Sequence, residues 1–326
     1  MRRFSVFFSS ASVFLASPCH AQSATIEPVG EVCPDRCPDR HAVFFIHGIY
    51  GNGQTFTNGS FDWPKALPRE VEWQRSGEGP IRKASIDVYR IDYQTALFAW
   101  ARKDIASLDE VTDALFEQLY GRSLSGLIPR RDYLSVGFIA HSLGGNVAAS
   151  YLHTVKSEIG HGERARHSFL ITLGTPVGGS QIANIGSVLK TLVGMQDPLL
   201  ESLKKDNTFL RMLQKWRRSE DIKAMRLSCR HVGLFIAIEG KPTNGFVEVV
   251  SSESARATVK DFASEVRVFD TYDHSRIAKP SGTDDPLYQW VNGVIQKGVS
   301  TAENWDGRTR CKPVGNGYLG PIGRPH

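Results

Sequence analysis

The sequence predicts an α/β fold in which helices flank a mainly parallel central sheet. Strand-like and helix-like segments alternate along the chain, and strands separated by helices need crossover connections that leave neighbouring strands parallel. The first strand-like segment, residues 42–46, is a short, continuous apolar run, which is typical of a strand buried on both faces. Of the 326 residues, 41% are hydrophobic and 22% are charged, a composition that argues against disorder.

The expected elements follow one another in a regular order. Six segments are expected to be strands: 42–46, 86–91, 133–140, 168–173, 232–238 and 266–269. Helices are expected over 105–119, 145–155 and 285–295, where apolar residues recur at helical spacing. Together these segments predict one domain over residues 42–300.

Two further regions flank this pattern. A helical insertion over residues 179–225 is expected after the fourth strand, and its apolar clusters favour ordinary amphipathic packing onto the sheet. The alternative for a smaller part of it is a cap over an active site. Residues 301–326 are rich in Gly and Pro without any period, so an irregular tail is expected there.

The start of the chain has the features of a secretory signal peptide. Arg2 and Arg3 precede an apolar run over residues 4–15, which is too short to span a bilayer, and a small residue, Ala21, ends the segment. We therefore expect residues 1–21 to be removed and the protein to be secreted or periplasmic. Losing Arg2 and Arg3 lowers the net charge from +5 to +3, too little to require a nucleic-acid partner.

The cysteines are consistent with export. Cys19 would leave with the signal peptide, and an N-terminal segment over residues 22–41 holds two of the four that remain. The remaining cysteines are Cys33, Cys37, Cys229 and Cys311. An even number in an exported protein predicts two disulfides, with three pairings open. Cys33 and Cys37 have no local His or further Cys partner, so no metal site is expected, and no cofactor either.

The strongest chemical signal is a serine between an expected strand and an expected helix. An apolar strand runs into Ala140-His141-Ser142-Leu143-Gly144. This pattern resembles the nucleophile elbow of α/β-hydrolases, with Ala140 in place of the usual first glycine. Small residues two before and two after the serine allow the sharp turn, and the helix N-terminus behind it favours developing negative charge. Ser142 is the candidate nucleophile.

A second motif supplies the groups that would stabilise an oxyanion. The first strand ends in His47-Gly48-Ile49, a turn that in α/β-hydrolases contributes one backbone N–H, while the residue after the nucleophile contributes the other. We therefore expect the N–H groups of Ile49 and Leu143 to form the oxyanion hole. His47 and His141 lie at strand ends and are expected to shape loops by hydrogen bonding rather than to take protons.

The general base is expected late in the chain, because the order in this fold is serine, acid, histidine. His274 lies in the loop after the sixth expected strand, where such a base belongs. Five rival histidines lie before the acid strand, at the start of a strand or at the terminus: His153, His161, His167, His231 and His326.

The acid is expected after the fifth strand, where more than one residue is a candidate. Glu239 ends that strand and can ionise, so it is preferred. Glu248, Asp270 and Asp273 remain alternatives, Asp273 the weakest because an immediate neighbour of His274 can seldom fold back onto its ring. An Asp-Gly position common in hydrolases is occupied here by Asn244-Gly245, and Asn cannot carry the charge that stabilises an imidazolium.

Together these motifs resemble the lipases and esterases of the α/β-hydrolase superfamily. The likeness is greatest to the serine esterase branch related to phospholipid-remodelling and GPI inositol deacylase-type enzymes. The matching segments run in the same order over roughly residues 42–295: 45–51, 138–145, 173–180, 239–243, 254–255 and 273–280. In that branch a Leu-Gly-Thr-Pro turn, here residues 173–176, borders the site, and a Glu before a Lys-Pro-Thr stretch resembles the acid position, which favours Glu239.

The resemblance implies a serine carboxylic-ester hydrolase acting on lipid-like esters through an acyl-serine intermediate. The expected partner is a lipid or small ester substrate, with transient contact to a membrane surface as an option and no nucleic acid. An acyltransferase or a polyester depolymerase would use the same catalytic residues. A non-catalytic binding protein on a hydrolase scaffold is the alternative from another class.

Overall fold

The computed structural model of the chain describes residues 24–48, 51–74, 80–93, 108–121, 123–159, 166–176, 232–242, 263–304, 311–314 and 318–321. The expected signal peptide (1–21) and the expected insertion (179–225) lie outside this part of the chain.

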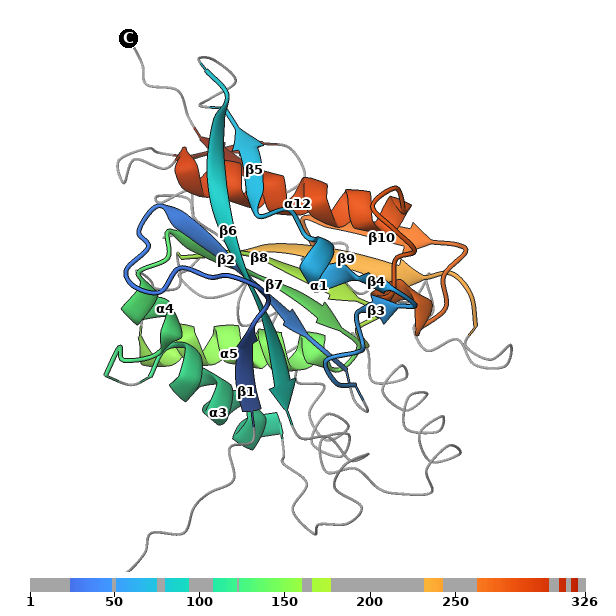
Figure 1. The fold of residues 1–326 in the computed structure, drawn as a ribbon, viewed down its shortest axis with the longest axis horizontal. Coiled ribbons are helices and arrows are strands. Elements are labelled where there is room, and N and C mark those ends of the chain that lie inside the picture. Colours follow the sequence, from blue (N-terminus) through green and yellow to red (C-terminus); the bar gives the residue numbers. More distant parts are fainter. Residues whose placement is uncertain are drawn as a thin grey trace, which may run out of the picture.

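An eight-stranded, mainly parallel sheet forms the centre of the described structure (Figure 1). The strand order is β1-β6-β2-β7-β8-β9-β10, and β5 also pairs with β6. The strands are β1 (Ala24–Pro28), β2 (Arg40–Ile46), β5 (Glu70–Trp73), β6 (Arg82–Tyr93), β7 (Ser135–His141), β8 (His167–Leu173), β9 (Gly233–Glu239) and β10 (Glu265–Phe269). β1 and β5 run antiparallel to β6, and the other neighbouring pairs in this sheet are parallel. The predicted fold class is confirmed.

All six expected strands are present, as β2, β6, β7, β8, β9 and β10. β1 and β5 were not expected, because both are short strands with several exposed side chains and lack a continuous apolar run. β1 also shows that the N-terminal cysteine segment is joined to the sheet rather than separate from it. Two small hairpins lie apart from the sheet: β3 (Thr57–Asn58) with β4 (Phe61–Asp62), and β11 (Cys311–Val314) with β12 (Tyr318–Pro321).

Helices cover both faces of the sheet (Figure 1). α3 (Leu108–Leu119) and α5 (Gly144–Glu158) lie on one face, and α12 (Pro286–Glu303) lies on the other with the short α1 (Trp63–Ala66). α4 (Leu127–Arg131) precedes β7. α12 continues beyond its expected end at residue 295, so it and the β11-β12 hairpin occupy part of the region expected to be irregular. In the described chain, no helix has both the length and the apolar character needed to cross a bilayer.

The sheet is buried on both faces, which explains the continuous apolar runs in the sequence. The neighbouring residues Phe44 and Phe45 of β2 point to opposite faces and are both at most 1% exposed. Phe44 stacks on Phe138, with ring centroids 5.5 Å apart, and Phe45 meets Trp63 edge-on at 5.6 Å. Burying each phenyl ring contributes about 1.5–3 kcal/mol to folding.

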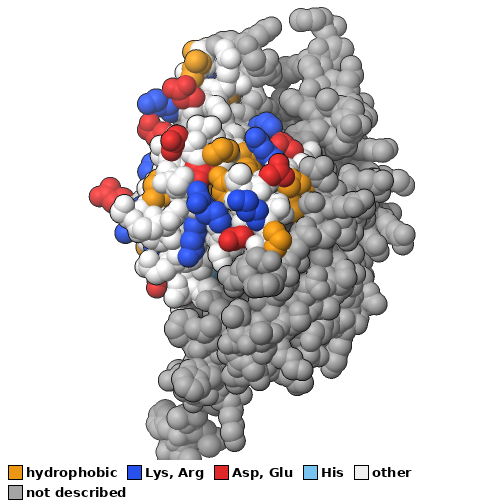
Figure 2. All heavy atoms as spheres, turned by 90° about the vertical axis from the view of Figure 1, so that its right-hand side faces the viewer, with side chains coloured by type: hydrophobic (Ala, Val, Ile, Leu, Met, Phe, Trp, Pro, Cys, Tyr) orange, Lys and Arg blue, Asp and Glu red, His pale blue; other side chains and the backbone are white. Residues whose placement is uncertain are grey.

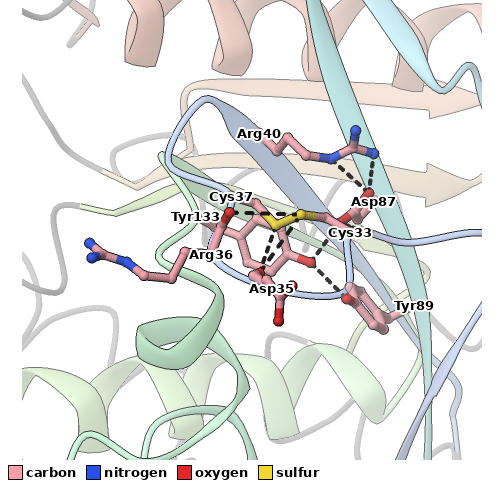
Figure 3. Close-up of a disulfide and its surroundings, with 8 residues drawn as sticks. All are labelled: Cys33, Asp35, Arg36, Cys37, Arg40, Asp87, Tyr89 and Tyr133. Atoms are coloured by element: carbon pink, nitrogen blue, oxygen red, sulfur yellow. Dashed lines mark hydrogen bonds and ion pairs between the residues drawn. A yellow bond between two sulfur atoms is a disulfide. The ribbon is translucent and has the colours of Figure 1, made fainter.

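The buried carboxylate of Asp87 anchors the N-terminal disulfide to the sheet, near the amino ends of its parallel strands (Figure 3). Cys33 and Cys37 are bonded to each other, which settles one of the pairings left open by the sequence; Cys229 lies outside the described residues. Asp87 of β6 is fully buried and accepts hydrogen bonds from the Cys33 N–H (3.0 Å) and the Tyr133 hydroxyl (2.7 Å). Arg40 pairs with its other oxygen. The network therefore satisfies a charge that would be costly to bury alone.

A second buried carboxylate fixes the segment between β10 and α12. Asp285 caps α12: its Oδ1 accepts from the Leu287 N–H (2.9 Å) and the Tyr272 hydroxyl (2.6 Å). Its Oδ2 accepts from the N–H (2.8 Å) and the hydroxyl (3.0 Å) of Ser281. Burial acts to raise the pKa of Asp285, but the hydrogen bonds from Tyr272, Ser281 and Leu287 outweigh it, so the pKa is lowered. Burial and the contact with Asp285 raise the pKa of Tyr272 to about 12. The carboxylate thus holds both ends of a loop that contains His274.

We expect Asp285→Asn to lower the free energy of unfolding at pH 7 by about 1–3 kcal/mol, because the amide cannot accept the same set of hydrogen bonds. A lowered folded-state pKa stabilises the protein above the unfolded pKa, and this stabilisation is lost as the pH falls through the folded pKa. The difference between wild type and variant should therefore shrink as the pH falls below about 4. Urea unfolding at pH 7 and at pH 3 measures it.

Asp284→Asn is the matched control, because Asp284 is the exposed neighbour of Asp285 and its substitution removes the same charge. Its effect should stay within about 0.5 kcal/mol. Equal destabilisation by the two variants, or a difference for Asp285→Asn that does not change with pH, would contradict the assigned role.

Candidate active site

Ser142 lies at the sharp turn between β7 and α5. Its φ is +51°, in the left-handed region that non-glycine residues rarely adopt. Three hydrogen bonds hold this conformation: the Ser142 N–H donates to the Leu173 carbonyl (2.8 Å), and the Ser142 carbonyl accepts from the Thr175 hydroxyl (2.8 Å) and the Gly145 N–H (3.0 Å). The expected turn at residues 173–176 therefore borders this site.

The turn after β2 packs directly against the serine turn. A Cβ placed on Gly48 would lie 2.7 Å from the Ser142 Cβ, and one on Gly144 would collide with the His47 carbonyl. Both glycines are thus required by space rather than by conformation. The contact brings the His-Gly turn, expected to carry an oxyanion donor, to Ser142.

His274 joins Ser142 to a buried carboxylate. Its Nε2 lies 2.9 Å from the Ser142 Oγ, and its Nδ1 lies 3.1 Å from Oε1 of Glu239, the last residue of β9. Glu239 and Ser142 are at most 2% exposed. Because a carboxylate only accepts, the Nδ1 of His274 carries the proton and the Nε2 accepts from the serine hydroxyl. The structure therefore brings together the three residues predicted as nucleophile, base and acid, from the ends of three different strands.

The other acid candidates occupy different positions. The Oδ1 of Asp273 accepts from the N–H groups of Ser275 (3.0 Å) and Arg276 (2.8 Å) and so caps the turn of its own loop, next to the short 3-10 helix η2 (Arg276–Ala278). Asp270 is exposed at the end of β10. Glu248 and Asn244 lie outside the described residues.

Gly174 lies beside both Glu239 and His274, and the sequence analysis did not identify it. Its φ is +58°, and a Cβ on it would lie 2.6 Å from the Glu239 Oε2 and 3.1 Å from the His274 Nδ1. A side chain here is excluded by the backbone conformation and by the closeness of both functional groups. The glycine of the Leu-Gly-Thr-Pro motif was the sequence signal that could have indicated this close approach.

One of the two expected oxyanion donors is described. Leu143 is buried and lies directly after Ser142, just before the first turn of α5, where helix amides lack intrahelical acceptors. Such amides favour negative charge developing nearby. Ile49 lies outside the described residues.

His47 and His141 both bond to backbone carbonyls, as expected of residues that shape loops. The His47 Nδ1 lies 2.7 Å from the Gly48 carbonyl, and the His141 Nε2 lies 2.8 Å from the His274 carbonyl. Tyr93 at the end of β6 stacks on the His47 ring at 4.4 Å and donates its hydroxyl to the His47 carbonyl (2.8 Å). The end of β6 therefore fixes the His-Gly turn, and the end of β7 contacts the loop that carries His274.

A second Ser-His-Glu arrangement lies at the amino edge of the sheet, and the sequence analysis missed it. The His41 Nδ1 is 2.7 Å from the Ser135 Oγ, and its Nε2 is 3.1 Å from the Glu303 Oε1. Ser135 begins β7, and its φ is not positive, in contrast to Ser142 at the other end of the same strand. It faces no strand-to-helix turn, so this arrangement links β2, β7 and α12 structurally.

Figure 2 shows the face toward which β9 and β10 run. On its coloured part, Lys and Arg side chains are interspersed with Asp and Glu side chains and with hydrophobic ones. Among the described residues, no group of three or more His, Cys, Asp or Glu side chains is arranged to hold a metal ion.

Comparison with known proteins identifies the fold. No protein-family model matches the sequence, and no curated protein matches it either. The mature form of lipase BlEst2 from Bacillus licheniformis is similar in structure, with a TM-score of 0.51 and 17% sequence identity over 83% of this chain and 98% of that one. Esterase B from Lactobacillus rhamnosis, in a structure with a tributyrin phosphonate inhibitor, gives a TM-score of 0.49 and 11% identity over 86% of this chain and 87% of that one. From its sheet order and its likeness to the Bacillus lipase, the chain has the α/β-hydrolase fold.

Proposed function

We propose that this protein is a serine carboxylic-ester hydrolase that works through an acyl-serine intermediate. One observation carries the proposal: the hydrogen-bonded series Ser142 Oγ, His274 Nε2, His274 Nδ1 and Glu239 Oε1, set at a strained strand-to-helix turn. A nucleophile bonded to a base that is oriented by a third group is the arrangement that activates a serine hydroxyl.

The reaction proceeds in two halves. His274 takes the hydroxyl proton through its Nε2 as the Ser142 Oγ attacks the ester carbonyl carbon, and Glu239 stabilises the imidazolium that forms. His274 then gives this proton to the leaving alcohol, and the acyl group remains on Ser142. Water then attacks the acyl-serine while His274 takes its proton, and His274 returns this proton to the Ser142 Oγ as the acid leaves.

The negative charge on the carbonyl oxygen needs donors aimed at it. We assign this role to the N–H groups of Leu143 and Ile49, the residues that follow the nucleophile and the His-Gly turn. Loss of one such donor typically raises the barrier by about 3 kcal/mol.

For the substrate class, we propose lipid-like esters. The Bacillus licheniformis neighbour is a lipase, and the sequence resembles the serine esterase branch related to phospholipid-remodelling and GPI inositol deacylase-type enzymes. Assays with p-nitrophenyl esters of increasing chain length and with phospholipid vesicles test it. Hydrolysis restricted to acetyl esters would contradict the lipid part of the proposal.

We also propose that the protein is exported, on the strength of the charged, apolar and small-residue pattern over residues 1–21. Expression of the full chain followed by N-terminal sequencing tests it. An exported product beginning at Gln22 supports the proposal, and a product that stays in the cytoplasm with Met1 or Arg2 at its N-terminus contradicts it.

Ser142→Ala should lower kcat/KM for p-nitrophenyl butyrate by at least about 1,000-fold, because it removes the nucleophile and leaves the other groups in place. Thermal unfolding should confirm that the variant is folded. A fluorophosphonate probe should label wild type at Ser142 and leave the variant unlabelled.

Ser135→Ala is the matched control, since Ser135 bonds to a histidine and a glutamate in the same way as Ser142 but in an extended strand. It should keep probe labelling and activity close to those of wild type. Retained activity in Ser142→Ala, or attachment of the probe to Ser135, would contradict the proposed function.

Gly174→Ala should lower kcat by about 10- to 100-fold, because the new Cβ forces the Glu239 and His274 side chains apart and small misplacements of catalytic groups are costly. Strain at a positive φ adds about 1–3 kcal/mol of destabilisation. Steady-state kinetics and urea unfolding measure the two effects separately.

Gly59→Ala isolates the backbone part of this effect. Gly59 has the same φ of +58°, and a Cβ on it would meet nothing within 4 Å. This variant should be destabilised to a similar extent but keep its kcat. A kcat loss of equal size in both variants would show that strain, rather than contact with Glu239 and His274, is responsible.

A further inference from the structure

The residue before the nucleophile contacts the residue that carries the base. His141 ends β7, and its Nε2 lies 2.8 Å from the backbone carbonyl oxygen of His274. The two rings are tilted by 44°, with centroids 5.0 Å apart. Residues 141 and 142 therefore hold His274 at two places, one through its backbone and the other through its ring.

The protonation state of His141 follows from its partners. A carbonyl oxygen only accepts, so the His141 Nε2 carries a proton and donates it. The Nδ1 is buried and has no hydrogen-bond partner among the described residues, so a second proton there would be buried unsatisfied. The neutral ring with its proton on Nε2 is the form that fits.

The surroundings keep this ring neutral while the base changes charge. Burial lowers the pKa of His141 to about 3, and positive charge on His274, His47 and Lys279 acts in the same direction, against the hydrogen bond to the His274 carbonyl. His141 thus remains a neutral donor when His274 becomes an imidazolium.

Hydrogen bonds within the loop that carries His274 fix the shape of the loop, but they do not set its position relative to Ser142. Asp273 caps its turn through the N–H groups of Ser275 and Arg276, and the Ile277 N–H donates to the Asp273 carbonyl (3.0 Å). These bonds fix the shape of the loop only. The bond from His141 joins that rigid turn to β7, the strand that ends at Ser142.

We propose that His141 is a positioning residue that sets the distance between base and nucleophile by donating its Nε2–H to the backbone carbonyl of His274. The proposal rests on the proposed function, because it assigns His141 a role through the base. It predicts a requirement for a donor at the place of Nε2 and for no other property of the imidazole.

Two amide side chains of different length test this requirement. The amide nitrogen of Gln reaches about as far from the backbone as the Nε2 of His, whereas that of Asn reaches only as far as the Nδ1. His141→Gln should therefore keep kcat for p-nitrophenyl butyrate within about threefold of wild type. His141→Asn should lose about 10- to 100-fold in kcat with KM almost unchanged, since substrate contacts remain while the base is displaced.

His141→Leu removes the hydrogen-bond donor but keeps a side chain of similar volume, so its kcat should be lowered to the same extent as that of His141→Asn. If the Leu variant does not fold, the two polar variants decide the question by themselves. A kcat equal to that of wild type in His141→Asn would overturn the proposal, as would a His141→Gln variant that is folded but as impaired as His141→Asn.

A measurement that needs no turnover separates this proposal from the proposed function. The proton on the His274 Nδ1, bonded to Glu239, should give a downfield proton NMR signal that persists in His141→Gln and is shifted or broadened in His141→Asn. Glu239→Gln identifies the signal by changing it in an otherwise unaltered chain. If the wild type shows this NMR pattern but no esterase activity, the proposed function is refuted and the positioning role of His141 is kept. If the wild type is active and all His141 variants give the same spectrum, the positioning role is refuted and the proposed function is kept.

Discussion

The left-handed backbone of Ser142 is the constraint on which the site depends. A non-glycine residue at φ +51° costs about 1–3 kcal/mol, and the conformation persists because three hydrogen bonds, to the end of β8, to Thr175 in the turn after it and to α5, over-determine it. The turn directs the Ser142 hydroxyl toward His274 in the loop after β10, and α5 begins two residues later, at Gly144. Gly48 and Gly144 allow the neighbouring backbone to approach this turn, so Ser142, the His-Gly turn and the loop that carries His274 meet at the carboxyl ends of the strands.

Residue types alone do not make this chemistry. Ser135, His41 and Glu303 form hydrogen bonds of nearly the same lengths as Ser142, His274 and Glu239. The difference lies in position: Ser135 starts β7 in an extended conformation, whereas Ser142 follows the same strand at its carboxyl end, in front of a helix N-terminus. In open α/β sheets the carboxyl ends of parallel strands are where ligands bind, because loops and helix N-termini gather there. At the amino ends of the strands, Ser135, His41 and Glu303 instead stabilise the fold, together with the hydrogen bonds of Asp87.

The sequence predicted the parts of the structure that depend on local pattern. Apolar, β-rich segments identified six of the strands, and the small residues around Ser142 identified the turn. His274 could be placed because its loop follows the last parallel strand. Glu239 stayed one of several candidates, since the contact between acid and base depends on how the ends of β9 and β10 lie relative to each other. β1 and β5 escaped detection because short, partly exposed edge strands carry little apolar signal, and the roles of Gly174 and His41 arise only from contacts between distant segments.

The hydrogen-bonded series implies that Glu239 acts only through His274, so the two residues form one functional unit. The most direct measurement is a double-mutant cycle on kcat/KM for p-nitrophenyl butyrate with His274→Ala, Glu239→Gln and the double variant. Glu239→Gln alone should lower the rate by about 100-fold or more, because the imidazolium loses its stabilising charge. The double variant should then be no slower than His274→Ala within about threefold, since groups that act as a unit are not additive. Losses that multiply in the double variant would contradict a single unit.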